Sequence, residues 1–380
     1  MWSVIDWNGK CEKSNEKCLH DSQIQKFFRN IFQSEQTKNH PKVADILTDL
    51  HNHFSYIPML DDLPTLDEVK FAFKRIQRGI GIDGLPPLTL KIIPPSMINC
   101  ILLLIQKVFL TSYPSDWNKQ ILHSITKKDH TYDNPDLRGI AIAPLLCRVY
   151  DNVIENRFSN WYKPNCQQAG FRKGQGCLMQ IFMLNLLINY SRAKQKNLFV
   201  AFMDYSKAFD YANRFRIVSD LMKNRCGTNF TRAIANMYIE TEYLPRLKGN
   251  MLGQSITTNY GVTQGRTSSA PIYSFYVSDM PDSLENIVCN DYMDPYNISQ
   301  LADDTAIIAE TLDSLAIKME SVLDYSREKF QVPNSKKTFF CNFTADPALH
   351  PIYSKNNIKI KSINADAGHK YLGMLYYPTE

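Results

Sequence analysis

The sequence predicts an α+β fold, in which helices and strands mix along the chain without the regular alternation of a parallel sheet. Its 380 residues are enough for two or three subdomains. Short apolar runs typical of strands are interspersed with segments of helical periodicity. We find neither an internal repeat nor a low-complexity tract, which favours a mixed globular fold over a repeat architecture.

The first elements follow a polar segment, residues 1–64, which we interpret as an extension or linker. One helical face stands out within it, formed by Ile24, Phe27, Phe28, Ile31 and Phe32. Thr65 and Glu68 then form a capping box, which predicts a helix that ends at Gly79. Further on, the pattern predicts a helix over residues 96–110 and strands over 117–125 and 137–146.

The rest of the chain continues this mixture. Apolar periodicity predicts helices near residues 176–193, 214–225, 230–242, 270–280 and 312–328. Strand patterns cover residues 198–204, a pair within 245–260, both flanks of residues 303–304, and 337–343, 357–361 and 370–376. The pair at 303–304 is therefore expected on a hairpin turn.

Composition narrows the class of protein only a little. The net charge of +5 and pI of about 8.6 permit a nucleic-acid partner, but a slightly basic enzyme surface explains them equally well. The nine cysteines are scattered, odd in number and without a C-x-x-C pair. This pattern favours reduced thiols over a disulfide framework or a zinc site.

The chain shows no targeting or membrane signal. Its N-terminus lacks the basic and apolar regions of a secretory signal, and the most apolar run, residues 101–105, is far too short to span a bilayer. We therefore expect a nuclear or cytoplasmic protein that is not secreted and has no membrane partner. The oligomeric state stays open.

Three aspartates suggest a metal site. Asp303 and Asp304 are adjacent and flanked by apolar residues, so their repulsion favours a bound cation between them. Asp204 follows a buried strand pattern, residues 198–204. Three carboxylates at the ends of buried strands are the oxygen ligands that a two-magnesium phosphoryl-transfer site requires.

Together with these aspartates, several other segments form a series of motifs in an order known from one protein family. From about residue 65 to 376 the chain resembles the reverse transcriptase domain of non-LTR (LINE-type) retrotransposons. Residues 202–210 (FMDYSKAFD) resemble motif A of that family. The resemblance implies that Asp204 and the backbone carbonyl of Tyr205 bind metal, and that Phe209 excludes a ribose 2′-hydroxyl. A core aromatic is the simpler interpretation of Phe209, and the two roles are compatible.

Two further segments resemble motifs B and C. Residues 301–304 (LADD) resemble motif C, so the resemblance makes Asp303 and Asp304 the remaining metal ligands. Leu301 replaces the aromatic residue usual there. Residues 261–270 (GVTQGRTSSA) resemble motif B, in which Gln264 would contact the incoming nucleotide and Gly265 would let the backbone approach it. Ala270 replaces the usual proline.

The segments that resemble the fingers carry basic residues. Residues 126–129 (TKKD) and 137–140 (LRGI) resemble two nucleotide-holding motifs. Arg138 would stack on the base and bind phosphate, and Lys127 or Lys128 would neutralise the triphosphate. A solvated lysine pair is the alternative. Residues 168–172 (QAGFR) match a further segment, which the resemblance associates with template and primer placement.

Near the C-terminal end, two more segments complete the resemblance. Residues 334–338 (NSKKT) resemble motif D, in which Lys337 would protonate the leaving pyrophosphate, although an exposed or phosphate-facing lysine is an equal alternative. Residues 370–374 (KYLGM) resemble the primer-grip hairpin, with Tyr371, Leu372 and Gly373.

The resemblance implies a right-hand polymerase. Its expected parts are residues 1–64 as the extension, 65–165 as fingers, 166–350 as palm, and 351–380 as the end of the palm with the primer-grip hairpin. The expected function is RNA-directed DNA synthesis, the addition of dNTPs to the 3′-hydroxyl of a DNA primer on an RNA template. Two Mg²⁺ ions are the expected cofactors, with Mn²⁺ as a substitute.

Two alternatives remain. The sequence ends soon after the primer-grip motif, so the thumb and endonuclease of the family are not visible in it. This favours, as the main alternative, a catalytically idle or truncated polymerase-fold remnant that binds nucleic acid. An RNA-directed RNA polymerase is the third hypothesis, and the bulk of Phe209 argues against it.

Overall fold

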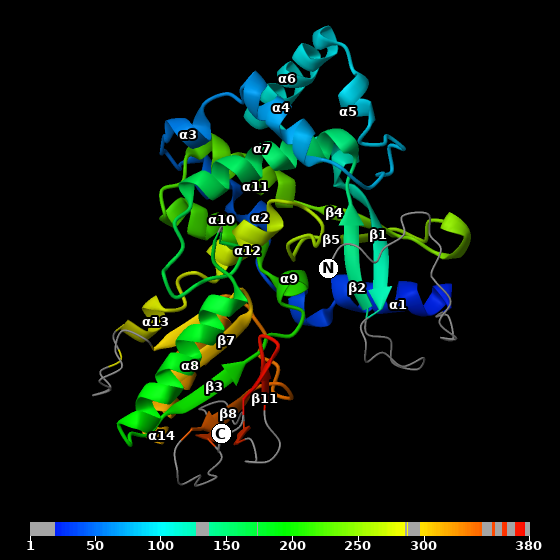
Figure 1. Ribbon diagram of the computed structural model, residues 1–380. Helices are drawn as coiled ribbons and strands as arrows, with labels where there is room; N and C mark the ends of the chain where they lie inside the picture. Colours follow the sequence, from blue (N-terminus) through cyan, green and yellow to red (C-terminus); the bar gives the residue numbers. More distant parts are fainter. Residues whose placement is uncertain are drawn as a thin grey trace. The chain divides into compact units, whose positions relative to one another are not determined.

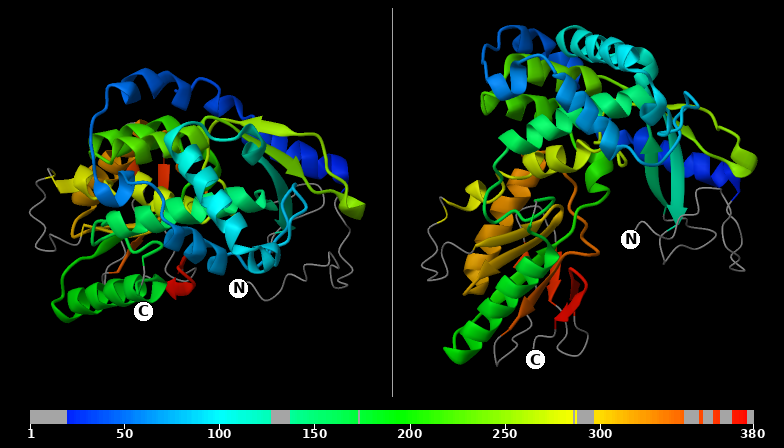
Figure 2. Two further views of the ribbon diagram at one scale, coloured as in Figure 1. Left: turned by 90° about the horizontal axis from the view of Figure 1, so that it is seen from above. Right: turned by 45° about the horizontal axis from the view of Figure 1, so that its top comes forward.

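A computed structural model describes residues 20–126, 137–172, 174–285, 287, 297–343, 352–353, 359–362 and 369–376. The chain divides into two compact units, each made of two stretches of sequence (Figures 1 and 2). The first unit contains Met1–Trp161 and Ile217–Ser269, and the second contains Tyr162–Arg216 and Ala270–Glu380. Helices and sheets mix in both, which confirms the α+β class predicted from the sequence.

The first unit is mainly helical. Its α-helices are α1 (Asp21–Phe32), α2 (Val43–His51), α3 (Pro58–Asp61), α4 (Leu66–Arg75), α5 (Thr89–Ile92), α6 (Pro95–Leu110), α7 (Leu145–Trp161), most of α10 (Arg214–Lys223) and α11 (Thr228–Tyr238). Short 3₁₀ turns lie at η1 (Glu35–Thr37), η2 (Ser115–Asn118) and η3 (Lys248–Asn250). Helices α4 and α7 pack against each other, and α11 packs on α2, α3 and α6.

A four-stranded sheet completes the first unit. Its strands are β1 (Lys119–Thr126), β2 (Leu137–Ile142), β4 (Thr241–Pro245) and β5 (Ile256–Thr258), in the order β2-β1-β4-β5. Neighbours are antiparallel except β1 and β4, which are parallel. Helix α1 packs on β4 and β5, so the apolar face predicted for it is partly a sheet contact.

The second unit is built on a six-stranded sheet. Its strands, in spatial order, are β6 (Ile298–Leu301), β7 (Asp304–Ala309), β3 (Phe199–Met203), β8 (Phe339–Asn342), β10 (Lys359–Ser362) and β9 (Ile352–Tyr353). A separate hairpin joins β11 (His369–Tyr371) and β12 (Met374–Tyr376). The helices are α8 (Cys177–Ala193), α9 (Ala208–Tyr211), α12 (Ser269–Tyr276), α13 (Asp282–Glu285) and α14 (Leu312–Glu328).

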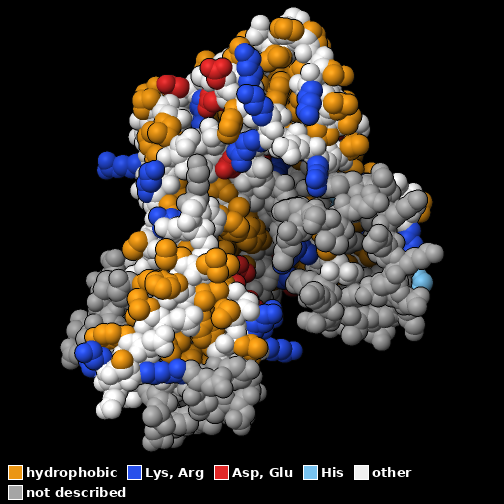
Figure 3. Space-filling model, in the orientation of Figure 1, with side chains coloured by type: hydrophobic (Ala, Val, Ile, Leu, Met, Phe, Trp, Pro, Cys, Tyr) orange, Lys and Arg blue, Asp and Glu red, His pale blue; other side chains and the backbone are white. Residues whose placement is uncertain are grey.

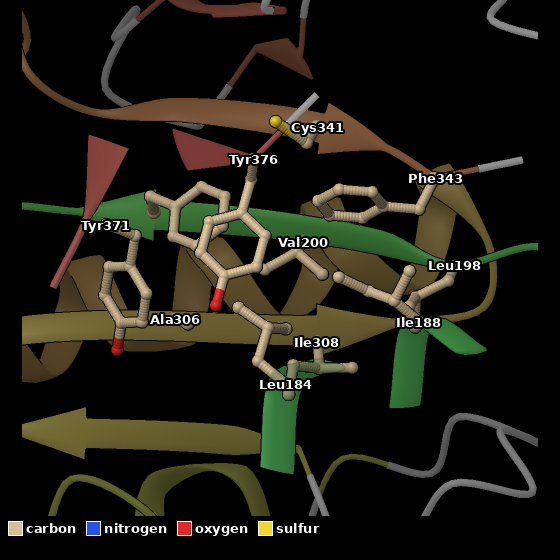
Figure 4. Close-up of a cluster of buried hydrophobic side chains, with 11 residues drawn as sticks. Leu184, Ile188, Leu198, Val200, Ala306, Ile308, Cys341, Phe343, Tyr371 and Tyr376 are labelled. Carbon is tan, nitrogen blue, oxygen red and sulfur yellow. The ribbon is translucent and has the colours of Figure 1, made fainter. Parts of the chain in front are cut away.

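The core of the second unit lies between this sheet, α8 and the β11–β12 hairpin (Figure 4). Alternate residues of the central strands point into it, and its members are Leu184, Ile188, Leu198, Val200, Phe202, Ala306, Ile308, Cys341, Phe343, Tyr371 and Tyr376. The intervening residues of β3 and β7 face the other way, and α14 contacts both strands. Strand β3 is thus buried on both faces, which explains its continuous apolar run.

Most predicted elements are found, with small corrections. The predicted capping box is formed: the Thr65 hydroxyl accepts a hydrogen bond from the Glu68 amide, and the Glu68 carboxylate accepts one from the Thr65 amide. The strand predicted over residues 137–146 is too long, because β2 ends at Ile142 and helix α7 begins at Leu145. The helix predicted over 230–242 ends at Tyr238, where β4 takes over.

The surface carries two groups of exposed apolar side chains, on α6 and on α8 (Figure 3). On α8 they recur every fourth residue, at Leu178, Phe182, Leu186 and Tyr190. No helix among the described residues is both long and apolar enough to cross a membrane.

Candidate active site

The three aspartates meet at one end of the central strands of the second unit. Strands β3 and β7 are antiparallel, and Met203 pairs with Thr305. The next position on each strand is therefore Asp204 beside Asp304. Strand β7 is joined to β6 by a tight hairpin in which Leu301 pairs with Asp304, so Asp303 lies in the turn between them. The hairpin predicted from the sequence is confirmed.

A loop that follows α14 supports Asp204. The Asn334 amide donates to the Asp204 carbonyl (2.8 Å), and the Asn334 side-chain amide donates to the Asp204 carboxylate (3.1 Å). The Lys337 ammonium lies 3.5 Å from the same carboxylate oxygen. Asn334 was missed in the sequence; its place three residues before Lys337 in the motif-D segment is the signal that could have found it.

Asp304 lies in a less compensated environment. Burial is the main cause that raises its pKa, to about 6, and the neighbouring charges of Asp303 and Asp204 raise it further. Lys337 acts in the opposite direction. At Asp304, burial and two neighbouring acids thus outweigh the opposing charge of Lys337.

The donor set suits hard divalent cations. Mg²⁺ prefers carboxylate oxygens, and a cation would relieve the repulsion that raises the Asp304 pKa. In the described part of the chain, however, no three His, Cys, Asp or Glu side chains already stand in the arrangement of a metal site. The chemistry of the donors fits the ion, and the ligand geometry is not preformed.

Tyr205 and Phe209 follow Asp204 and are held differently. The Tyr205 side chain is buried and its hydroxyl shares a hydrogen bond with that of Ser326 (2.8 Å), so this side chain is a core group. The Phe209 ring is stacked on Tyr273, with centroids 4.3 Å apart, and is edge-on to Phe171 at 6.0 Å. The Tyr273 hydroxyl accepts a hydrogen bond from Gln331 (3.0 Å). Tyr273 was not singled out in the sequence.

The predicted nucleotide-binding residues Arg138, Gln264 and Gly265 belong to the first unit. The Ala141 amide of β2 donates to the Gln264 carbonyl (2.7 Å). Gly265 has φ +121°, and a Cβ there would lie 2.2 Å from the Ala141 carbonyl oxygen, so only glycine fits. Arg138 is exposed on the same strand, β2. The motif-B loop is thereby fixed to the strand that carries Arg138.

Asp151 of α7 holds the other side of this loop. It is 2% exposed, and its carboxylate accepts hydrogen bonds from the Thr267 amide and hydroxyl (both 2.7 Å) and from the amide and hydroxyl of Ser268. Four donors on one buried carboxylate make it a structural anchor. No local sequence pattern indicates this role, because the two segments are more than 100 residues apart.

The remaining predicted residues divide into two groups. Lys127 and Lys128 lie outside the described residues. Tyr371, Leu372 and Gly373 form the end and the turn of the β11–β12 hairpin, with positive φ at Leu372 and Gly373. The Tyr371 ring is buried against Phe202, with centroids 4.8 Å apart, so the core fixes the base of this hairpin.

Comparison with known proteins identifies the class. Residues 125–375 match the family described as reverse transcriptase (RNA-dependent DNA polymerase), and the chain belongs to that family. The relatives identify the type: they are Pol polyproteins of R2 retrotransposable elements, which confirms the predicted resemblance to non-LTR retrotransposons.

The R2 relatives are distant. The polyprotein of Bradysia coprophila is 23% identical over 261 residues, covering 68% of this chain and 30% of its own length. That of Drosophila melanogaster is 22% identical over 317 residues, covering 79% and 29%. The chain thus spans about three tenths of these relatives. Among solved structures, apo telomerase from Candida tropicalis is similar with a TM-score of 0.44 and 14% identity, over 63% of this chain and 53% of that one.

Proposed function

We propose that this chain is the polymerase part of a non-LTR retrotransposon protein and catalyses RNA-directed DNA synthesis by a two-metal mechanism. The observation that carries the proposal is the register of β3 and β7: Met203 pairs with Thr305, so Asp204 and Asp304 are the next positions at the same sheet end, with Asp303 in the adjoining turn. The raised pKa of Asp304 supports it, because a fold gains nothing from gathering acids unless a cation joins them.

In this proposal the aspartates Asp204, Asp303 and Asp304, with the Tyr205 carbonyl, would hold two Mg²⁺ ions, or Mn²⁺ as a substitute. Bound ions of this kind lower the pKa of an attacking hydroxyl and stabilise charge on phosphate oxygens. The Lys337 side chain is 66% exposed and its ammonium lies beside Asp204, so it could reach a leaving pyrophosphate and donate a proton.

The nucleotide and nucleic-acid roles rest on the motifs. We propose that Arg138, Lys127 and Lys128 bind the incoming triphosphate and that Gln264 and Gly265 contact its sugar and base. Tyr371, Leu372 and Gly373 would form the primer grip. The anchoring of the motif-B loop by Asp151 and by Ala141 supports a defined position for Gln264. RNA template, DNA primer and dNTPs are the proposed partners, in the nucleus or cytoplasm.

The test is primer extension on an RNA template with dNTPs and Mg²⁺, then Mn²⁺. The control is the double variant Asp303→Asn, Asp304→Asn. We expect extension by the wild type and none by the control. Binding of template and primer that ignores divalent metal, with no extension by the wild type, would instead establish the idle remnant that binds nucleic acid.

Sugar selection has its own test. The stacking of Phe209 on Tyr273 supports Phe209 as a fixed barrier to a 2′-hydroxyl. Replacement by Val opens space, so we expect rNTP incorporation relative to dNTP to rise about 10- to 100-fold. The measurement is the ratio of kcat/KM for the two nucleotides. An unchanged ratio removes Phe209 from sugar selection, and wild-type preference for rNTPs would make the protein an RNA polymerase.

A further inference from the structure

The turn that carries Asp303 is held by a buried glutamine from a distant segment. Gln168 is 0% exposed. Its side-chain oxygen accepts hydrogen bonds from the Ala302 amide (2.9 Å) and from the Gly170 amide (2.8 Å). Its side-chain nitrogen makes a longer hydrogen bond to the Ala302 carbonyl (3.4 Å). Both backbone polar groups of Ala302 therefore engage one side chain.

The backbone on either side reinforces this contact. The Ala169 amide donates to the Gln300 carbonyl, and the Gln300 amide donates to the Gln167 carbonyl, both at 2.9 Å. Gly170 lies so close that an added Cβ would be 2.4 Å from the Ala302 amide nitrogen. Residues 167–170 thus lie directly along β6 and against the turn, with no space between them.

The turn needs such support because its backbone is unfavourable. Ala302 has φ +59°, in the left-handed region, where a two-residue hairpin turn usually has glycine. A residue other than glycine stays in this region only when surrounding contacts impose it. Around Ala302 such contacts are supplied by the hydrogen bonds of the Gln168 side chain and by the close approach of Gly170.

We propose that Gln168 is a positioning residue for the metal site: it imposes the left-handed conformation of Ala302 and so fixes where the Asp303 carboxylate stands. This role rests on the proposed function of the three aspartates. It assigns residues 168–170 to support of the catalytic turn, in place of the template and primer placement that their resemblance implies.

The experiment compares two buried glutamines of the second unit. Gln168→Met keeps the length of the side chain and removes the acceptor for Ala302. Gln180→Met is the matched control, because Gln180 is also buried and accepts a hydrogen bond from Ser299 of β6, away from the turn. Each variant and the wild type are measured by amide hydrogen exchange over residues 298–306 and by Mn²⁺ binding through paramagnetic relaxation of water protons.

For Gln168→Met we expect faster exchange at Ala302 and about tenfold weaker Mn²⁺ binding, the usual effect of losing a group that orients a metal ligand. Gln180→Met should leave both unchanged. Gly170→Ala gives a second test, since it crowds the Ala302 amide while keeping Gln168, and should reproduce the same pair of changes.

Equal exchange and equal Mn²⁺ binding in the two glutamine variants would overturn the proposal. Loss of folding by Gln168→Met alone, with normal Mn²⁺ binding by Gly170→Ala, would assign Gln168 to general packing and overturn it as well. Failure of the proposed function is distinguishable, because then the wild type itself would neither bind Mn²⁺ through Asp303 nor extend a primer, while the exchange result at Ala302 would still stand.

Discussion

Two acidic sites of the molecule are built in opposite ways. In the first unit, the Glu68 carboxylate of α4 receives a two-pronged ion pair from Arg157 of α7, at 2.6 and 2.8 Å. Burial alone would raise the Glu68 pKa, but the hydrogen bonds from Arg157 and Thr65 outweigh it and lower the pKa. In the second unit, burial and the neighbouring acids raise the pKa of Asp304.

The difference distinguishes an acid that stabilises the fold, Glu68, from one that we propose binds a catalytic metal, Asp304. Arg157 is 5% exposed and also donates to the carbonyl oxygens of Leu60 and Asp62, so Nε and both terminal nitrogens of its guanidinium are hydrogen-bonded. Among the described residues, the one basic group that lowers the pKa of Asp304 is Lys337, which pairs with Asp204 and is largely exposed. Glu68 is thus balanced by a buried arginine, whereas Asp304 is balanced only weakly by the described part of the chain.

The largest expected effect is on activity at the second site. Asp304→Asn should lower primer extension by at least about 10³-fold, because a proposed metal ligand is lost. It should not lower the melting temperature in metal-free buffer, since it removes repulsion. Thermal melting with EDTA checks this, and a clearly lower melting temperature would show that Asp304 is a structural acid like Glu68.

At the first site, the expected effect of a substitution is on the stability of the fold. Arg157→Met leaves the Glu68 carboxylate without its cation and should destabilise the fold by about 3–5 kcal/mol. Urea unfolding measures it. Arg75→Met is the matched control, because Arg75 also joins α4 to α7, through Glu155, but is 35% exposed. That variant should lose less than about 1 kcal/mol, and equal losses would contradict the distinction.

Lys337 tests whether a charge at the second site matters for stability at all. Its side chain is 66% exposed, so Lys337→Met should change the free energy of unfolding by less than about 0.5 kcal/mol. As a general acid its loss should lower kcat about 10²-fold. Lys336→Met, at the exposed neighbouring position, is the control. If both variants keep full kcat, Lys337 is only a surface lysine.

Sequence patterns predicted the local features of the two sites but not the contacts between distant segments. The α+β class, the hairpin at Asp303 and Asp304, and the capping box at Thr65 follow from local rules: apolar periodicity, turn position and cap spacing. The roles of Gln168, Asp151 and Arg157 do not, because each bonds to a segment about 90 or more residues away. Only the folded chain brings those partners together.

The exact ends of helices and strands also depend on tertiary contacts that sequence patterns do not reveal. Residues 137–146 are mostly apolar in sequence, yet β2 stops at Ile142 and α7 begins at Leu145. A short apolar run suits a buried strand or a buried helix equally well, and tertiary contacts decide between them. The division into fingers and palm therefore stays a prediction from the motifs.

The smallest expected effect is on the pH dependence of stability. The folded pKa of Asp304, about 6, lies above its ordinary 3.8, so between these values the folded state binds more protons than the unfolded state. Its contribution should therefore weaken the fold as pH rises from about 4 to 6. The folded pKa of Glu68 is lowered, so its contribution is present above its ordinary value of 4.5 and is lost as pH falls further.

Urea unfolding from pH 3 to 8 in EDTA gives the free energy of unfolding as a function of pH, and so separates the contribution of Asp304 from that of Glu68. Subtracting the curve of Asp304→Asn should isolate a decline with rising pH, and subtracting that of Glu68→Gln should isolate a loss at acid pH. Added Mg²⁺ should remove the decline due to Asp304 and leave the loss due to Glu68, because Glu68 is already paired with Arg157, whereas in the described residues Asp304 is opposed only by the more distant charge of Lys337. Two slopes of the same sign, or a Mg²⁺ effect on the Glu68 slope, would contradict the division between the two sites.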